Sequence, residues 1–301
     1  MLTKKIPTTK LPAWLEGWTA LDLGGREHQQ DAIAFQMAPR RSDLPGPAFQ
    51  HPTAVCVCDG LGGHGPGSGA VAKRAADAFV RVAADLHPRL PLGEVATAAI
   101  TAARSAGVSA AGGHVERGGP DTAILGGVVH RDGSFVLIGR GDCRAFIVRA
   151  DLSERLVFTT ELHRSSRNRL TNTLIGHDLH ESSIESNNAS LYLKEFGWDG
   201  IPVFSPAVSY APRTGIGTLL NGDWLILATD GAWDPEVGDA RSKEGMDAMR
   251  RAPADHVLAA LDDSRAKFNP AAEMVASARA KGSTDNAAVI ALRFLGQSSF
   301  F

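Results

Sequence analysis

Five aspartates of this chain stand at the ends of short apolar segments, where carboxylates are well placed to bind a cation. Carboxylates that a fold brings together repel one another unless a cation neutralises them. A set of oxygen ligands favours Mg²⁺ or Mn²⁺ over Zn²⁺. One aspartate at a strand end usually belongs to an ordinary turn, but the repetition predicts a divalent metal site. The five aspartates are Asp31, Asp59, Asp142, Asp230 and Asp285.

The stretch CDGLGGHGPGSGAVA (58–72) follows an apolar segment and is rich in glycine. Glycine lets the backbone turn sharply and approach a ligand without a Cβ in the way. An alanine-rich segment comes next, so we expect a helix that begins near Gly67 or Ser68, with the Ser68 side chain as its cap. A nucleotide-binding loop of the G-x-x-x-x-G-K-[ST] type is excluded because the lysine is missing.

The remaining pattern predicts strands and helices in an order typical of an α+β protein. Strict alternation of strand and helix is missing, which favours a sandwich of two antiparallel sheets with helices outside over a parallel sheet. Segments rich in proline and glycine at 40–52, 112–121 and 211–217 are predicted to be loops. The predicted strands are 32–37, 53–58, 122–130, 134–139, 145–150, 223–229 and 287–294, and the predicted helices are 68–86, 93–110 and about 254–280.

Length and composition indicate one globular domain over residues 1–301, with a core of about 18–295. A polar, weakly periodic insert at about 160–212 is expected to be either functional or a solvated surface excursion. The formal net charge of −2 gives no electrostatic reason to expect nucleic acid or a membrane as the main partner.

The three cysteines are an odd number, which argues against a disulfide framework. Cys56 and Cys58 have no second pair of cysteine or histidine nearby, so we expect them in the core and not at a zinc ion. The sequence shows no secretory signal and no apolar run of about 20 residues, the length of a membrane helix. The expected location is therefore the reducing cytoplasm.

Five motifs occur in the order found in metal-dependent protein phosphatases of type 2C (the PPM family), and the chain resembles the compact bacterial members. The resemblance implies a β-sandwich of two antiparallel sheets flanked by helix pairs, with metals in a cleft at one end. It also implies hydrolysis of phosphoserine and phosphothreonine in proteins. The motifs are GREHQQDAIAF (25–35), CDGLGGHGPGSGAVA (58–72), IGRGDCRAFIV (138–148), LATDGAWD (227–234) and GSTDNAAVIAL (282–292).

The resemblance implies a role for each matching residue of the metal site. Asp59 would bridge two metal ions and the Gly60 carbonyl would coordinate the second ion. Asp230 and Asp285 would complete the first site, and Asp31 would hold metal-bound waters. The ions implied are Mn²⁺ or Mg²⁺, and the bridging water or hydroxide is the nucleophile.

Arg26 matches the phosphate-binding arginine of the family, and its guanidinium can bind two phosphate oxygens. Leu61 stands where many animal members carry a histidine proposed as general acid, so the leaving oxygen would take its proton from water or another group. Asp121 and Asp234 are candidates for a third, weaker metal site. The expected catalytic residues are Arg26, Asp31 and Asp59, and those expected to support the metals are Gln30, His64, Asp142 and Asn286.

The partner expected from the resemblance is a phosphorylated protein, which includes a Ser/Thr kinase or the targets of one. Two alternatives stay open at this stage. One is a binding or sensor module with weak catalysis, which would require lost metal ligands, and none of the principal ligands is lost. The other is a hydrolase of small phosphoesters, because one fold can carry several functions.

Overall fold

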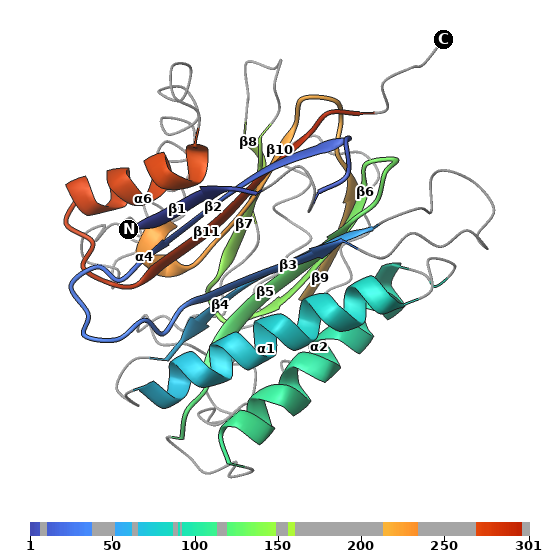
Figure 1. Cartoon of the computed structure of the whole chain (residues 1–301). Helices are drawn as coiled ribbons and strands as arrows, with labels where there is room; N and C mark the ends of the chain where they lie inside the picture. Colours follow the sequence, from blue (N-terminus) through green and yellow to red (C-terminus); the bar gives the residue numbers. More distant parts are fainter. Residues whose placement is uncertain are drawn as a thin grey trace, which may run out of the picture.

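Two antiparallel β-sheets lie face to face in the computed structural model, and helices cover their outer faces (Figure 1). The sandwich places the ends of several strands from both sheets near one another. The structure describes residues 1–6, 11–37, 52–61, 66–86, 90, 92–112, 119–148, 156–159, 213–233 and 269–296.

Each sheet is a series of antiparallel neighbours. The six-stranded sheet has the order β1 (Leu2–Lys5), β2 (Leu15–Asp22), β11 (Ala287–Phe294), β10 (Trp224–Ala228), β7 (Arg144–Val148) and β8 (Leu156–Thr159). The five-stranded sheet has the order β3 (Ala32–Met37), β4 (Thr53–Gly60), β5 (Thr122–Val129), β6 (Ser134–Arg140) and β9 (Arg213–Thr218).

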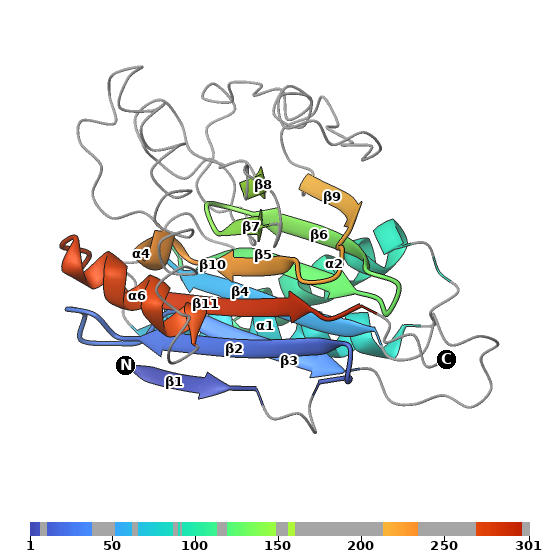
Figure 2. The ribbon, with the colours of Figure 1, turned by 90° about the horizontal axis from the view of Figure 1, so that it is seen from above.

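Four helices cover the sheets within the described part of the chain. The long helices α1 (Pro66–Asp85) and α2 (Leu92–Ala110) pack on the five-stranded sheet. The short α4 (Asp230–Trp233) and α6 (Pro270–Ala280) pack on the six-stranded sheet. Figure 2, seen from above, shows α6 beside β11 and β2, and α1 and α2 on the far side of the other sheet.

The alternation of side chains along each strand builds three apolar layers. In β4, Val55 and Val57 lie between the two sheets, while Cys56 and Cys58 face α1 and α2. In β11, Ile290 lies between the sheets and its neighbours face α4 and α6. The three cysteines are free and buried, so the expected core position of Cys56 and Cys58 is confirmed.

The predicted sandwich of two antiparallel sheets with flanking helices is confirmed. The loop predicted at 211–217 is wrong, because Arg213–Thr218 pairs with β6 as the edge strand β9. Ser68 does not cap α1: it lies inside the helix, and its buried hydroxyl makes no hydrogen bond in the described structure. The insert at 160–212 and helix residues 254–268 lie outside the described residues.

Two strands at the start of the chain were not predicted. β1 carries two lysines at the sheet edge, and β2 is interrupted by glycine and charged residues, so neither shows a clean apolar pattern. No helix among the described residues is long and apolar enough to cross a membrane.

Candidate metal centre

Three aspartates converge where the two sheets meet at one end of the sandwich. Asp59 is the penultimate residue of β4, Asp142 lies in the turn before β7, and Asp230 is the first residue of α4. One carboxylate oxygen from each lies within 4.8 Å of the other two. Asp142 is buried and the other two are partly exposed, so the group is open to solvent on one side.

The electrostatics of this cluster favour a bound cation. Burial raises the pKa of Asp59 well above its ordinary value, and the charges of Asp230, Asp31 and Asp142 raise it further. Burial also raises the pKa of Asp31, and the charges of Asp230 and Asp285 add to that effect. Buried like charges at this separation are costly unless a cation neutralises them. Carboxylate oxygens are the donors that Mg²⁺ and Mn²⁺ prefer, so the donor set fits such an ion.

Asp31 is fixed in the seam between the sheets. It lies directly before β3 and is almost fully buried. Its Oδ2 accepts a hydrogen bond of 2.7 Å from the Thr229 hydroxyl, and its backbone N–H donates to Gln29 Oε1 at 3.3 Å. Thr229 directly follows β10 and precedes Asp230, so a residue at the end of one sheet holds an acid at the end of the other.

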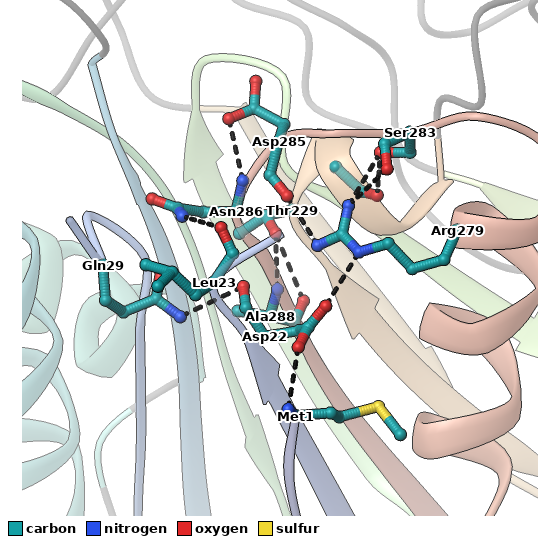
Figure 3. Close-up of polar contacts among 11 residues, drawn as sticks. Met1, Asp22, Leu23, Gln29, Thr229, Arg279, Ser283, Asp285, Asn286 and Ala288 are labelled. Carbon is teal, nitrogen blue, oxygen red and sulfur yellow. Dashed lines mark hydrogen bonds and ion pairs between the residues drawn. The ribbon is translucent and has the colours of Figure 1, made fainter. Parts of the chain in front are cut away.

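The turn that carries Asp285 and Asn286 (Figure 3) lies against Gly231, the residue that follows Asp230. Asp285 Oδ1 accepts from the Asn286 backbone N–H at 2.8 Å, and Oδ2 pairs with Arg26 Nη2 at 2.7 Å. Asn286 accepts from the Gln30 backbone N–H and donates to the Leu23 carbonyl, both at 2.8 Å. Asn286 therefore ties the start of β11 to the segment that leads into Asp31.

Arg279 of α6 holds this turn from the other side (Figure 3). Its Nη2 donates to the Asp285 carbonyl at 2.6 Å, Nη1 donates to the Ser283 carbonyl at 2.8 Å, and Nε donates to Asp22 Oδ2 at 2.8 Å. Burial acts to raise the pKa of Asp22, but the hydrogen bonds and charges of Arg279 and the N-terminal ammonium of Met1 outweigh it and hold the pKa below its ordinary value.

Arg279→Lys is expected to destabilise the protein by about 1–3 kcal/mol, because the point charge of an ammonium cannot replace the directed hydrogen bonds of the guanidinium. Urea unfolding measures the effect. Arg81→Lys, on the exposed face of α1, is the matched control and should stay within about 0.5 kcal/mol of wild type. Equal stability of the two variants would contradict a structural role for the Arg279 contacts.

Two glycines permit close backbone approaches at the site. A Cβ on Gly60 would lie 2.6 Å from the Gln30 carbonyl oxygen and 2.9 Å from the backbone of Ser68. A Cβ on Gly231 would overlap the backbone oxygen of Asn286. These contacts place the end of β4 against the Gln30 segment, and the start of α4 against the Asp285 turn.

The other predicted site residues are placed as follows. Asp121 is fully buried, accepts from the Thr122 backbone N–H at 2.7 Å, and precedes the strand that pairs with Gly60. Gln30 is buried beside Asp31. His64 and Asp234 lie outside the described residues, so their roles and the third metal site stay predictions.

Sequence reasoning did not single out Thr229 or Arg279, and it gave Asp142 only a supporting role. Thr229 carried one signal, its position directly before Asp230 in LATDGAWD. Arg279 carried none, because its contacts join residues as far apart as 257 positions in the chain.

Among known proteins, this chain is similar in fold to solved structures of bacterial serine/threonine phosphatases. Neither a scan against protein-family models nor a search of the curated proteins finds a match to this chain. Among solved structures, the Mycobacterium tuberculosis serine/threonine phosphatase PstP/Ppp is similar at a TM-score of 0.58 and 18% identity, over 94% of this chain and 99% of that one. Staphylococcus aureus Stp1, a serine/threonine phosphatase, is similar at a TM-score of 0.61 and 18% identity, over 96% of this chain and 98% of that one.

A structure of the PstP catalytic domain in complex with two manganese ions matches at a TM-score of 0.54 and 18% identity, over 93% of this chain and 97% of that one. At this identity the comparisons establish the fold. The described part of the chain therefore has the two-sheet fold of these bacterial serine/threonine phosphatases.

Proposed function

We propose that this protein is a metal-dependent serine/threonine phosphatase that hydrolyses phosphoserine and phosphothreonine in proteins. One observation carries the proposal: Asp59, Asp142 and Asp230 bring carboxylate oxygens within 4.8 Å of one another. They do so in a fold shared with bacterial serine/threonine phosphatases. The order of the five sequence motifs supports the same activity.

The residues that would hold two Mn²⁺ or Mg²⁺ ions are Asp59, the Gly60 carbonyl, Asp230 and Asp285. Asp142 joins this set because its carboxylate lies in the same cluster. Such a pair of ions lowers the pKa of a shared water and offsets the charge of the phosphate. The two manganese ions in the PstP complex support the number of ions and the type of metal.

Arg26 and Asp31 would act beside the metals. The Arg26 side chain is 46% exposed and pairs with Asp285, a proposed metal ligand, so its guanidinium is open to solvent and can bind a phosphate group. Asp31 is held by Thr229 and would accept hydrogen bonds from water at the site. Gln30 and Asn286 would keep the Asp31 segment in place.

Hydrolysis is expected to require Mn²⁺ or Mg²⁺ and to stop in EDTA. Release of phosphate from a phosphothreonine peptide and from p-nitrophenyl phosphate measures it. Asp230→Asn should lose more than about 100-fold in activity, because it removes a proposed direct ligand and even outer ligands cost about 10–100-fold. Asp77→Asn, in an exposed ion pair on α1, is the control and should keep full activity.

A folded protein that releases no phosphate with any metal would contradict the proposal and favour a binding module. Turnover of the small ester without turnover of the peptide would favour a hydrolase of small phosphoesters. The substrate protein, its link to a Ser/Thr kinase and a cytoplasmic location remain parts of the proposal. The location is supported by three free cysteines.

A further inference from the structure

The Thr229 hydroxyl joins the two sheets at the candidate metal centre. Thr229 lies between β10 and α4, and its side chain is fully buried. The Ala288 backbone N–H of β11 donates to Thr229 Oγ1 at 2.8 Å. Thr229 Oγ1 lies 2.7 Å from Asp31 Oδ2 and 3.4 Å from the Ala288 carbonyl oxygen.

The direction of these hydrogen bonds is fixed by elementary chemistry. A backbone N–H can only donate, so the threonine oxygen must accept from Ala288. The hydroxyl has one proton left, and the shorter contact assigns it to Asp31 Oδ2. The relay therefore runs from the backbone of β11, through Thr229, to the carboxylate of Asp31. Valine has nearly the same shape but can neither accept nor donate.

We propose that Thr229 is a positioning residue that fixes the Asp31 carboxylate against Asp230 and so preorganises the metal centre. Thr229 is covalently joined to Asp230, and its hydroxyl holds the acid of the opposite sheet. Both acids are therefore set by one residue that directly follows β10. This inference rests on the proposed function, because it assigns Asp31 and Asp230 to the metal centre.

The test compares Thr229→Val, Thr229→Ser and wild type by titration calorimetry with Mn²⁺ and by steady-state hydrolysis of a phosphothreonine peptide. Thr229→Val is expected to weaken Mn²⁺ binding by about 10-fold or more and to lower kcat by about 10–100-fold, the usual range for a residue behind a ligand. The KM for the peptide should stay within about threefold, since Thr229 does not contact the substrate. Thr229→Ser keeps the hydroxyl and should therefore keep the Mn²⁺ affinity and the kcat close to those of wild type.

Thr53→Val is the matched control. Thr53 is equally buried, at the far end of β4, and its hydroxyl has no hydrogen-bond partner in the described structure. This variant should bind Mn²⁺ and turn over like wild type. A double-variant cycle adds a second check: once Asp31→Ala has removed the acceptor, Thr229→Val should cause no further loss.

A folded Thr229→Val protein with wild-type Mn²⁺ affinity and kcat would overturn the inference and leave the proposed function intact. If Thr229→Val lowers Mn²⁺ affinity and kcat as much in the Asp31→Ala protein as in wild type, that result would overturn the inference as well. Should Thr229→Val not fold, Thr229→Ser decides: near-normal Mn²⁺ binding supports the relay, and a loss of about 10-fold or more overturns it. Wild-type protein that neither binds Mn²⁺ nor hydrolyses phosphate would overturn the proposed function and this inference together.

Discussion

Asp59→Asn is expected to make the metal-free protein more stable while abolishing its stabilisation by Mn²⁺. In wild type the Asp59 carboxylate is surrounded by Asp31, Asp142 and Asp230, and burial and these charges raise its pKa. Each pKa unit of such a shift corresponds to about 1.4 kcal/mol of destabilisation once the group is ionised. Asparagine has nearly the same shape and no charge, so the repulsion is removed together with a ligand.

The pH dependence of this effect has a definite sign. A carboxyl with a raised pKa binds its proton more tightly in the folded than in the unfolded chain. Its destabilising effect is therefore complete above the raised pKa and vanishes as the pH falls to the ordinary range of aspartate. In EDTA, the stability difference between Asp59→Asn and wild type should narrow as the pH is lowered.

Urea unfolding in EDTA and in Mn²⁺ measures both parts of the prediction. At a Mn²⁺ concentration 100 times its Kd, wild type should gain about 2.7 kcal/mol and Asp59→Asn almost nothing. Asp77→Asn removes an exposed carboxylate and should behave like wild type in both conditions. If Asp59→Asn were less stable than wild type in EDTA, this result would contradict the charge repulsion inferred around Asp59.

Gly231→Ala is expected to cost about 3 kcal/mol of stability, at the upper end of the range for overpacking, and to weaken Mn²⁺ binding. The added Cβ would overlap the backbone oxygen of Asn286, which is not the movable end of a side chain. The Gly231 carbonyl also accepts from Ser283 Oγ at 2.8 Å. Relief of the overlap must therefore move Asp230 away from the turn that holds Asp285.

Gly93→Ala provides the control for Gly231→Ala. Gly93 lies in α2 and a Cβ there would meet nothing within 4 Å, so alanine should stabilise the helix by about 0.5–1 kcal/mol. The two substitutions add the same methyl group and should change the free energy of unfolding in urea in opposite directions. Wild-type stability in Gly231→Ala would mean that the approach of α4 to the Asp285 turn is not needed.

Much of the fold could be predicted because it follows local rules. The strands β4 and β11 are apolar on both faces, since one faces helices and the other face meets the second sheet. Such segments stand out in the sequence. β2 and β9 did not, because glycine and charged residues interrupt β2, and β9 begins beside Pro212 and contains two glycines. Their strand conformation comes from pairing with β11 and β6, which only the assembled sheet provides.

The site was predictable at the level of residue type and less so at the level of contacts. Aspartates at strand ends pointed to the metal centre, and three of them converge. The sequence placed Asp142 among the five strand-end acids but gave it only a supporting role, and it could not show that Asp285 pairs with Arg26. Those placements depend on side chains from segments far apart in the chain, such as the relay from Ala288 through Thr229 to Asp31.

The most direct test of the account is calorimetric titration of metal-free wild-type protein with Mn²⁺, with Asp59→Asn and Asp230→Asn measured alongside. We expect two bound ions per wild-type chain and a loss of at least one ion in each variant. Binding of no Mn²⁺ by folded wild type, or unchanged binding in both variants, would show that the carboxylates do not form a metal centre.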